Sequence, residues 1–363
     1  MLFRSAPLDI ARGLSVLFMV LIHVQEYFLN HNTAQPQLES FVDFLGGIPA
    51  APVFMFLMGV GWVYSRRSTP KVLLRRGLGL LGTGYLLSIM RGVLPNLLHF
   101  TVSGSPYYLA QGIQQLVFVD ILQFSGLAMM AFALIKRINL GPKAVALMAV
   151  GLAVINGILA YYYEVIAFEE VLVPLGYTYA SIASGLGQLI LEHILGLFVG
   201  YNGLTFFPFL TWMIYPLLGY LFGYGLVRVS NQARFYTING FIGMVIFFGT
   251  TYVLDYILEW ENLLYSASGY YHHQGLENMI ASGFVLFFIG VCYWMTKVLP
   301  QWIKKPIMRW STNVTDIYFI HWVIIGWLTV FINYGTLTTP YYLVLVLMIF
   351  WVSDRLASGK VSK

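Results

Sequence analysis

Long apolar segments recur along the whole chain and constrain its fold more than any other feature. Ten of them approach or exceed the length of about 20 residues that a helix needs to cross a bilayer. They lie near 8–29, 41–65, 72–94, 113–135, 144–163, 205–227, 238–258, 279–297, 313–333 and 340–356. Because 59% of the 363 residues are hydrophobic and only 10% are charged, a water-soluble fold could not bury the apolar surface. The sequence therefore predicts an all-α integral membrane protein, in which residues 1–363 form one domain of ten transmembrane helices.

Basic residues predict how these helices are oriented. With ten spans, the Lys and Arg clusters at 66–76, 136–143 and 297–309 fall on one side, and only Arg91 falls on the other. The positive-inside rule then places both termini in the cytoplasm of a multi-pass protein of the inner or plasma membrane. The segment 187–200 is too short to span comfortably, and a crossing there would move every later basic loop outside. We therefore expect a re-entrant or interfacial helix at that point.

Composition also excludes several kinds of site. The single cysteine, Cys292, rules out an intramolecular disulfide and a thiolate metal cluster. His272 and His273 are adjacent on a loop and have no third ligand at a telling distance, so no metal site is expected. The net charge of +5 follows from the topology of the loops and does not indicate a nucleic-acid partner. The expected partner is the lipid bilayer, and the formation of a homo-oligomer stays open.

The first apolar segment carries a polar stripe. Eleven helical steps of about 100° return the chain to nearly the same face, so Asp9, Arg12 and His23 share one face with Ser15 and Glu26. Ionisable side chains inside a bilayer are costly and usually face a bundle interior or a wet cavity, and neutral histidine suits proton transfer near pH 7. We expect Arg12, about 16 Å along the axis from His23, to hold the charged head of a long substrate whose reactive end reaches His23. The structural alternative is a histidine bonded between helices and an arginine that snorkels to the interface.

Other polar residues within apolar segments are candidates for substrate contact. His321 lies near the middle of its segment, where it either lines the same cavity or has a structural role. Asp120, in the outer half of its expected helix, and Arg91 either pair with each other or contact substrate. Asp43 is expected to cap the N-terminus of the second helix.

Several motifs resemble known families of membrane acyltransferases. A resemblance to the type 3 family rests on Asp9-Ile-Ala-Arg12-Gly13 followed by His23, and on Ser311 with Tyr318-Phe-Ile-His321. A closer resemblance, to the heparan-α-glucosaminide N-acetyltransferase-like proteins and their bacterial relatives, rests on Leu8-Asp9, Arg12-Gly13-Leu14-Ser15, Phe28-Leu29-Asn30-His31, Ala51-Pro52-Val53-Phe54-Met55-Phe56-Leu57-Met58-Gly59, Arg75-Arg76-Gly77 and Asp120-Ile-Leu-Gln123. The likeness is dense over residues 5–125 and thin after them.

The resemblance implies a helical bundle that moves an acyl group, usually acetyl, from a coenzyme A thioester to a hydroxyl or amine. The acceptor in such families is typically a sugar on the far side of the membrane. The type 3 signature implies His23 as the catalytic histidine, whereas the second family implies His31, with Asn30 beside it. We prefer His23 and keep both.

Basic residues after the second span are the candidates for binding the donor, acetyl-CoA. Arg66, Arg67, Arg75 and Arg76 carry guanidinium groups that match phosphate oxygens bidentately, although the same charges also serve topology. The predicted mechanism is direct transfer, in which a neutral histidine removes the acceptor's proton; an acyl-histidine intermediate is the variant.

Two other classes of protein compete with this interpretation. A secondary transporter of a small polar solute also has proline-broken helices and ionisable residues at the midplane, but the two halves of this chain show no pair of equivalent broken segments. A noncatalytic structural or channel-like protein would have no use for the costly polar stripe.

Overall fold

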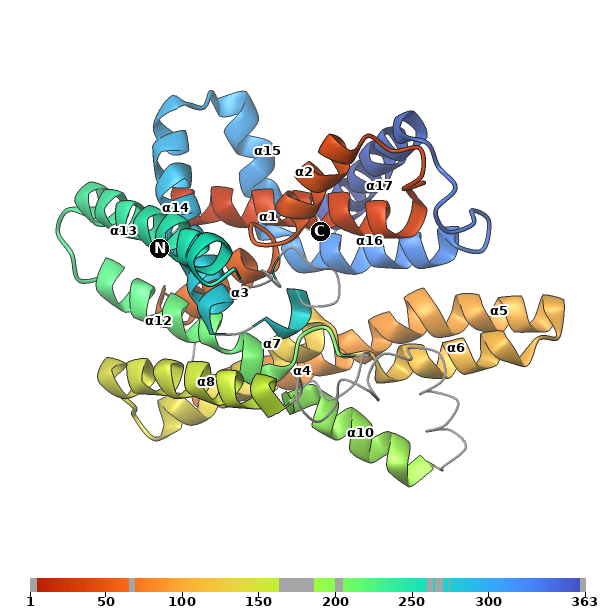
Figure 1. Ribbon diagram of the computed structural model, residues 1–363, viewed down its shortest axis with the longest axis horizontal. Helices are drawn as coiled ribbons and strands as arrows, with labels where there is room; N and C mark the ends of the chain where they lie inside the picture. The colour runs from red at the N-terminus through yellow and green to blue at the C-terminus, as the bar shows by residue number, and fades with distance from the viewer. Residues whose placement is uncertain are drawn as a thin grey trace. The chain divides into compact units, whose positions relative to one another are not determined.

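The computed structural model describes residues 5–64, 69–162, 186–199, 205–259, 264, 270–273 and 275–359. Over these residues the chain is helical and has no β-sheet, as Figure 1 shows. The chain divides into two compact units. The first comprises Met1–Leu57, Arg228–Glu261 and Met279–Lys363, and the second comprises Met58–Val227 and Asn262–Asn278.

The first unit is built around α1 (Ala6–Phe28), which packs against four other helices of this unit (Figure 1). These are α2 (Pro36–Gly46), α15 (Gln301–Thr312), α16 (Val314–Leu328) and α17 (Thr339–Gly359). The unit also contains α13 (Gln232–Tyr252) with the π-helical turn Val253–Ile257, most of α14 (Leu276–Val298), and the first half of α3 (Ala51–Tyr64). Four residues of its polar stripe, Asp9, Arg12, Ser15 and His23, are buried or half-buried in this unit, whereas Glu26 is exposed.

A glycine lets α15 approach α1 closely. A Cβ added at Gly13 would lie 2.1 Å from the carbonyl oxygen of Ile307, a distance that no side chain can tolerate. On the same helix Ile10, Val16 and Val20 are fully buried, so apolar packing supplies most of the contact. The close approach fixes α15 beside the N-terminal half of α1.

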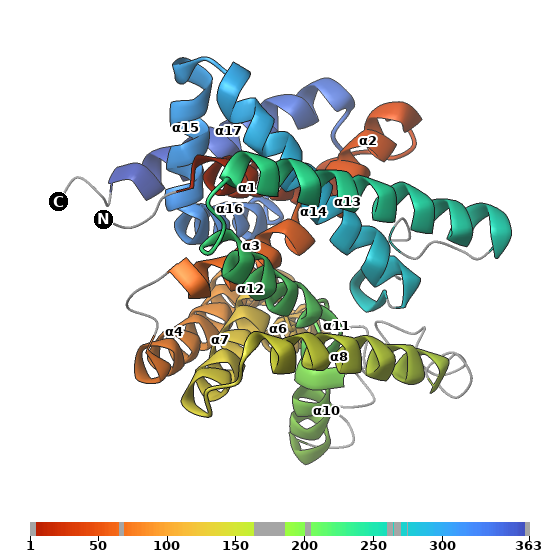
Figure 2. The ribbon, with the colours of Figure 1, turned by 90° about the vertical axis from the view of Figure 1, so that its left-hand side faces the viewer.

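Small residues also join α13 to α14, which lie side by side in Figure 2. A Cβ at Gly240 would lie 3.0 Å from the Cα of Gly290, and one at Gly243 would lie 2.5 Å from the carbonyl oxygen of Gly283. Such spacing lets two backbones pack closely, as is common between membrane helices.

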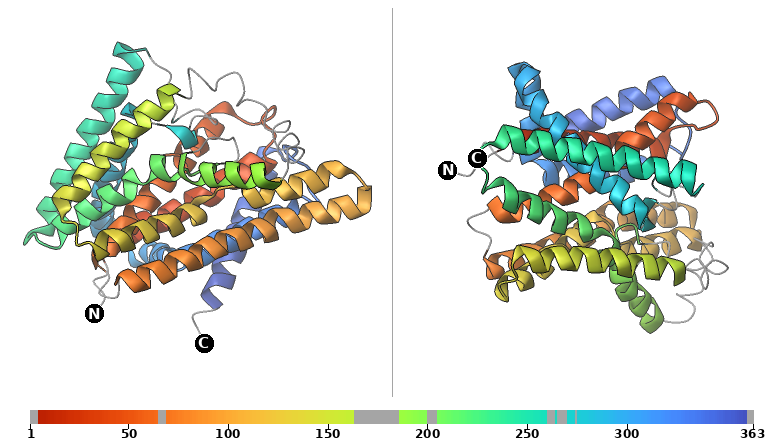
Figure 3. Two further views of the ribbon diagram at one scale, coloured as in Figure 1. Left: turned by 90° about the horizontal axis from the view of Figure 1, so that it is seen from below. Right: turned by 60° about the vertical axis from the view of Figure 1, so that its left-hand side comes forward.

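The second unit is dominated by α4 (Pro70–Ser88) and α7 (Ile121–Arg137), which pack along each other. A π-helical turn, Ile89–Val93, joins α4 to α5 (Leu94–Ser103), and α6 (Pro106–Val117) returns beside α5 (Figure 3). The remaining elements are α8 (Pro142–Tyr162), α10 (Leu186–Val199), α11 (Phe209–Trp212), α12 (Ile214–Leu226) and the short turn Tyr270–His272.

Seven helical stretches among the described residues are long and apolar enough to cross a membrane. They are Ala6–Phe28, Pro36–Tyr64, Pro70–Ser103, Phe209–Leu226, Gln232–Ile257, Leu276–Val298 and Thr339–Gly359, and two shorter apolar helices cover Pro142–Ile158 and Val314–Leu328. The prediction of an all-helical, multi-pass membrane protein is confirmed.

Two local predictions are wrong. The expected continuous helix over 113–135 is interrupted, because α6 ends at Val117 and α7 begins after Asp120. Asp120 is therefore not within a helix but caps α7, where its side chain accepts from the N–H of Ile121 at 2.6 Å. Asp43 does not cap the second helix, because α2 already begins at Pro36. The expected short helix at 187–200 corresponds to α10, and residues 163–185, which precede it, lie outside the described residues.

Candidate functional site

The end of α1 that carries His23 is fixed by the segment that precedes α17. The N–H of Asn30 donates to the carbonyl of Leu337 at 2.8 Å, and the N–H of Leu337 donates to the carbonyl of Phe28 at 2.8 Å. Gly335 turns this segment with φ +65°, a left-handed conformation that favours glycine. The last turn of α1 thus has a defined position within the first unit.

His23 and His321 form a hydrogen-bonded pair. Nδ1 of His23 lies 3.0 Å from Nε2 of His321, and the two rings are parallel to within 3°. Nδ1 of His321 lies 3.0 Å from the carbonyl oxygen of Ile317, one turn earlier in α16. His321 is fully buried, whereas His23 is half-buried, so His23 is the more accessible ring of the pair.

Aromatic rings surround this pair. The centroid of Trp322 lies 4.2 Å from that of His23, and Tyr318 approaches His23 edge-on at 6.4 Å. Tyr27 contacts Trp322 at 5.6 Å. The imidazoles therefore lie among aromatic side chains, which lower the local dielectric, and the face of Trp322 can stabilise a cation.

The other end of the predicted stripe forms a second polar cluster within the first unit. Ser311 of α15 donates to Oδ1 of Asp9 at 3.0 Å, and Nη1 of Arg12 lies 3.8 Å from the same oxygen. Arg12 also donates to the carbonyl of Leu57 at 3.5 Å, and Ser15 lies 2.8 Å from the carbonyl oxygen of Pro49. Arg12 is thus held among α1, α3 and the Ser311–Asp9 contact.

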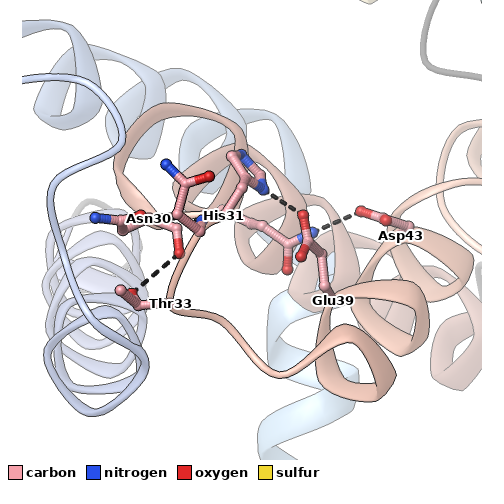
Figure 4. A network of polar contacts seen from close by, with 7 residues as sticks. Asn30, His31, Thr33, Glu39 and Asp43 are labelled. Atoms are coloured by element: carbon pink, nitrogen blue, oxygen red, sulfur yellow. Dashed lines mark hydrogen bonds and ion pairs between the residues drawn. The ribbon is translucent and has the colours of Figure 1, made fainter.

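His31 lies in the loop between α1 and α2, where it forms an ion pair with Glu39, as Figure 4 shows. The His31 side chain is 54% exposed, so this pair is largely solvated. Asn30 accepts a backbone hydrogen bond from Asn32 through Oδ1 at 3.0 Å and one from Thr33 Oγ1 through its carbonyl at 3.2 Å. These contacts shape the loop locally.

A further contact ties this loop region to α1. Nε2 of Gln25 donates to Oδ1 of Asp43 at 2.5 Å. Gln25 is buried, and this bond gives its buried amide N–H a partner. Asp43 therefore fastens α2 to α1.

The remaining predicted site residues that the structure describes belong to the second unit. Arg75 and Arg76 are exposed on α4. Nη1 of Arg91, in the π-helical turn, lies 2.8 Å from Oδ2 of Asp120, and both side chains are almost fully buried. The expected mutual pairing of Arg91 and Asp120 is therefore present. Arg66 and Arg67 lie outside the described residues.

The sequence reasoning missed the aromatic partners of the site. Trp322 and Tyr318 flank His321 in α16 at one residue after and three residues before it. The spacing of Tyr318 was an available signal, because residues three apart share one helix face. Trp322 directly follows His321 and lies about 100° around the helix from it, so its contact with His23 had no such signal. The pairing of His23 with His321 had no local signal, since 298 positions separate the two residues.

Comparison with known proteins gives one match. The family model described as heparan-alpha-glucosaminide N-acetyltransferase, catalytic, matches residues 4–260. This range includes α1 and His23 but ends before His321. No curated protein and no solved structure matches the chain. Among the described residues, no group of three His, Cys, Asp or Glu side chains is placed to hold a metal ion.

Proposed function

Because the chain belongs to the heparan-alpha-glucosaminide N-acetyltransferase catalytic family, we propose that it transfers an acyl group from acyl-CoA to a hydroxyl or amine. We propose acetyl-CoA as the donor and a sugar, reached from the outer side of the membrane, as the acceptor. The observation that carries the proposal is His23: a half-buried imidazole in the first membrane helix, paired with a second imidazole at 3.0 Å.

In this proposal His23 is the general base. As the acceptor oxygen or nitrogen attacks the thioester carbonyl, its proton passes to the imidazole. The tetrahedral species then collapses, the C–S bond breaks, and the leaving sulfur takes the proton from His23. One C–O or C–N bond forms as one C–S bond breaks, and the histidine returns to its neutral form.

We assign the donor's phosphates to cationic side chains. Arg75 and Arg76 are exposed and adjacent on α4, and guanidinium groups bind phosphate oxygens in pairs; Arg66 and Arg67 complete the proposed set. Arg12, with its neighbour Asp9, is proposed to guide the pantetheine chain along α1 toward His23.

We assign the acceptor to groups expected on the outer side. Asn30 and His31 lie just after the last turn of α1, and His31 is the alternative base if His23 is not the acting one. Arg91 and Asp120, which form an ion pair, are proposed as further acceptor contacts, and His321 is proposed to act on the acceptor through His23.

The proposed topology has ten spans in one transmembrane domain, with both termini in the cytoplasm and α10 as a re-entrant helix. The seven long helices and two shorter apolar ones support a count near this number. The positive-inside distribution of Lys and Arg supports the orientation.

The test is an acyl-transfer assay on the purified full-length chain in liposomes, with radiolabelled acetyl-CoA and a panel of sugars and amino sugars. We expect acetylated acceptor and an equal amount of free CoA thiol. Arg75→Ala with Arg76→Ala should weaken donor binding about tenfold, because two charge-assisted contacts are lost, whereas Lys143→Ala, an exposed cation on α8, should not. Solute counterflow without thiol release would identify a transporter and overturn the proposal.

A further inference from the structure

We propose that His321 is a positioning residue that fixes the tautomer of His23 and shares the positive charge that His23 acquires during transfer. This inference rests on the proposed function, since it assigns a role to His321 in that same site. The role differs from substrate contact, because His321 is fully buried behind the half-buried His23.

The tautomers follow from the acceptor at the end of the chain of hydrogen bonds. A carbonyl oxygen can only accept, so Nδ1 of His321 carries a proton and donates it to the oxygen of Ile317 at 3.0 Å. In a neutral His321 the other nitrogen, Nε2, then carries the lone pair. Nδ1 of His23, 3.0 Å away, must therefore be the donor of the bond between the two rings.

The consequence for His23 concerns its second nitrogen. A neutral imidazole that is protonated on Nδ1 has its basic lone pair on Nε2. A general base needs that lone pair directed at the proton to be removed. His321 thus selects the basic form of His23 and also fixes the plane of its ring, since the two rings are parallel to within 3°.

The pair also suits the charged intermediate state. When Nε2 of His23 takes the acceptor's proton, the imidazolium keeps its Nδ1–H bond to His321, and that bond becomes charge-assisted and stronger. The Ile317 carbonyl supports the far side of His321. The face of Trp322, at 4.2 Å, offers cation–π stabilisation of the same charge.

The first test is kinetic and uses two substitutions at one position. His321→Leu removes the acceptor for His23, and we expect kcat to fall about 10²-fold with the KM for acetyl-CoA changed less than about twofold. His321→Gln keeps an acceptor oxygen near the position of Nε2, and we expect it to recover kcat to within about tenfold of the wild type. His99→Leu, the same change at a histidine of the second unit, is the matched control and should leave kcat unchanged.

The second test reads the tautomer directly and does not depend on activity. Nitrogen-15 NMR of histidine-labelled protein in lipid, with the His23 signal assigned by its loss in His23→Gln, should show Nδ1 protonated and Nε2 unprotonated in the wild type. His321→Leu should shift His23 toward a mixture of tautomers. An Nε2-protonated His23 in the wild type, or a His321→Leu kcat within twofold of the wild type, would overturn the assignment.

The two proposals fail in distinguishable ways. If the wild type transfers acetyl and His23→Ala does not, but His321→Leu is fully active, then the role of His321 is wrong and the function stands. If the wild type transfers nothing to any acceptor while the tautomers are as described, then the pair is structural and the proposed function is wrong.

Discussion

Two histidine pairs flank the last turn of α1, and they differ in burial and in partner. His23 is paired with another imidazole, His321, which is fully buried. His31 is paired with a carboxylate, Glu39, and its side chain is 54% exposed. Only eight positions separate His23 from His31, yet one lies among aromatic rings and the other faces solvent.

The comparison shows how surroundings decide what a histidine can do. Among the aromatic rings, the hydrogen bond between His23 and His321 is electrostatically stronger than it would be in water, and it fixes the orientation of the His23 ring. In the loop, water competes with Glu39 for His31, so that this exposed contact contributes little to stability. The family resemblance alone left both histidines as catalytic candidates, and the geometry favours His23.

The largest expected effect is a difference in kcat between substitutions of His23 and of His31. His23→Ala should lower kcat about 10³-fold, because it removes the general base, whereas His31→Ala should lower it less than about threefold. Parallel single-turnover assays with radiolabelled acetyl-CoA measure both. Equal losses of kcat in the two variants would contradict the prediction that the more buried histidine, His23, is the general base.

A buried pair of opposite charges in the second unit extends the comparison. Arg91→Met should lower the free energy of unfolding by about 3–5 kcal/mol, because it leaves the buried carboxylate of Asp120 without its cation. Adding Asp120→Asn, which keeps an N-cap for α7, should restore much of the loss. Chemical unfolding in detergent measures the four corners of this cycle. Strictly additive effects would show that the 2.8 Å contact carries no coupling.

The pH dependence of stability tests a third histidine, His273, which is buried and directly follows the Tyr270–His272 turn. Burial lowers the pKa of His273 to about 4, so the folded protein keeps this ring neutral, bonded to Tyr215 at 2.5 Å. In the unfolded chain the pKa is ordinary, about 6.5. As the pH falls from about 6.5 to 4, the unfolded state binds a proton that the folded state does not bind, and the free energy of unfolding decreases by at most about 3.4 kcal/mol.

Thermal unfolding between pH 7.5 and 4.5 measures this effect. His273→Gln, which keeps an acceptor for Tyr215, should have a shallower dependence on pH than the wild type. An identical slope in the variant would show that other groups cause the acid sensitivity.

Helices α1 and α7 show most clearly which features of the fold the sequence could predict. The stripe of Asp9, Arg12 and His23 is readable because helical periodicity is local. The break before α7 was also readable, since Asp120 and Gln123 have the spacing of a capping box, but the apolar run around it suggested an unbroken span. Hydropathy averages over a window and hides a cap of one residue.

Contacts between residues far apart in the sequence could not be predicted from such local patterns. His321 reaches His23 through the packing of α16 on α1, which depends on contacts along both helices. Asp43 was misassigned because α2 begins at Pro36, about two turns before Asp43, and proline is favoured in the first turn. Local signals predicted which residues matter, and only tertiary structure showed which of them meet.

The smallest expected effect concerns the exposed pair. Glu39→Gln should change the free energy of unfolding by less than about 1 kcal/mol, because a solvated ion pair contributes little, and kcat by less than about twofold. The same unfolding and transfer assays measure it. A tenfold fall in kcat would move the catalytic role to the His31–Glu39 pair and reverse the comparison.

The most direct test of the account is acetyl transfer in liposomes by the wild type and by His23→Ala, with donor binding measured in both. The account predicts stoichiometric CoA thiol and acetylated acceptor from the wild type, and donor binding without turnover from the variant. Full turnover by His23→Ala would contradict it, because the reaction would then need no base on α1.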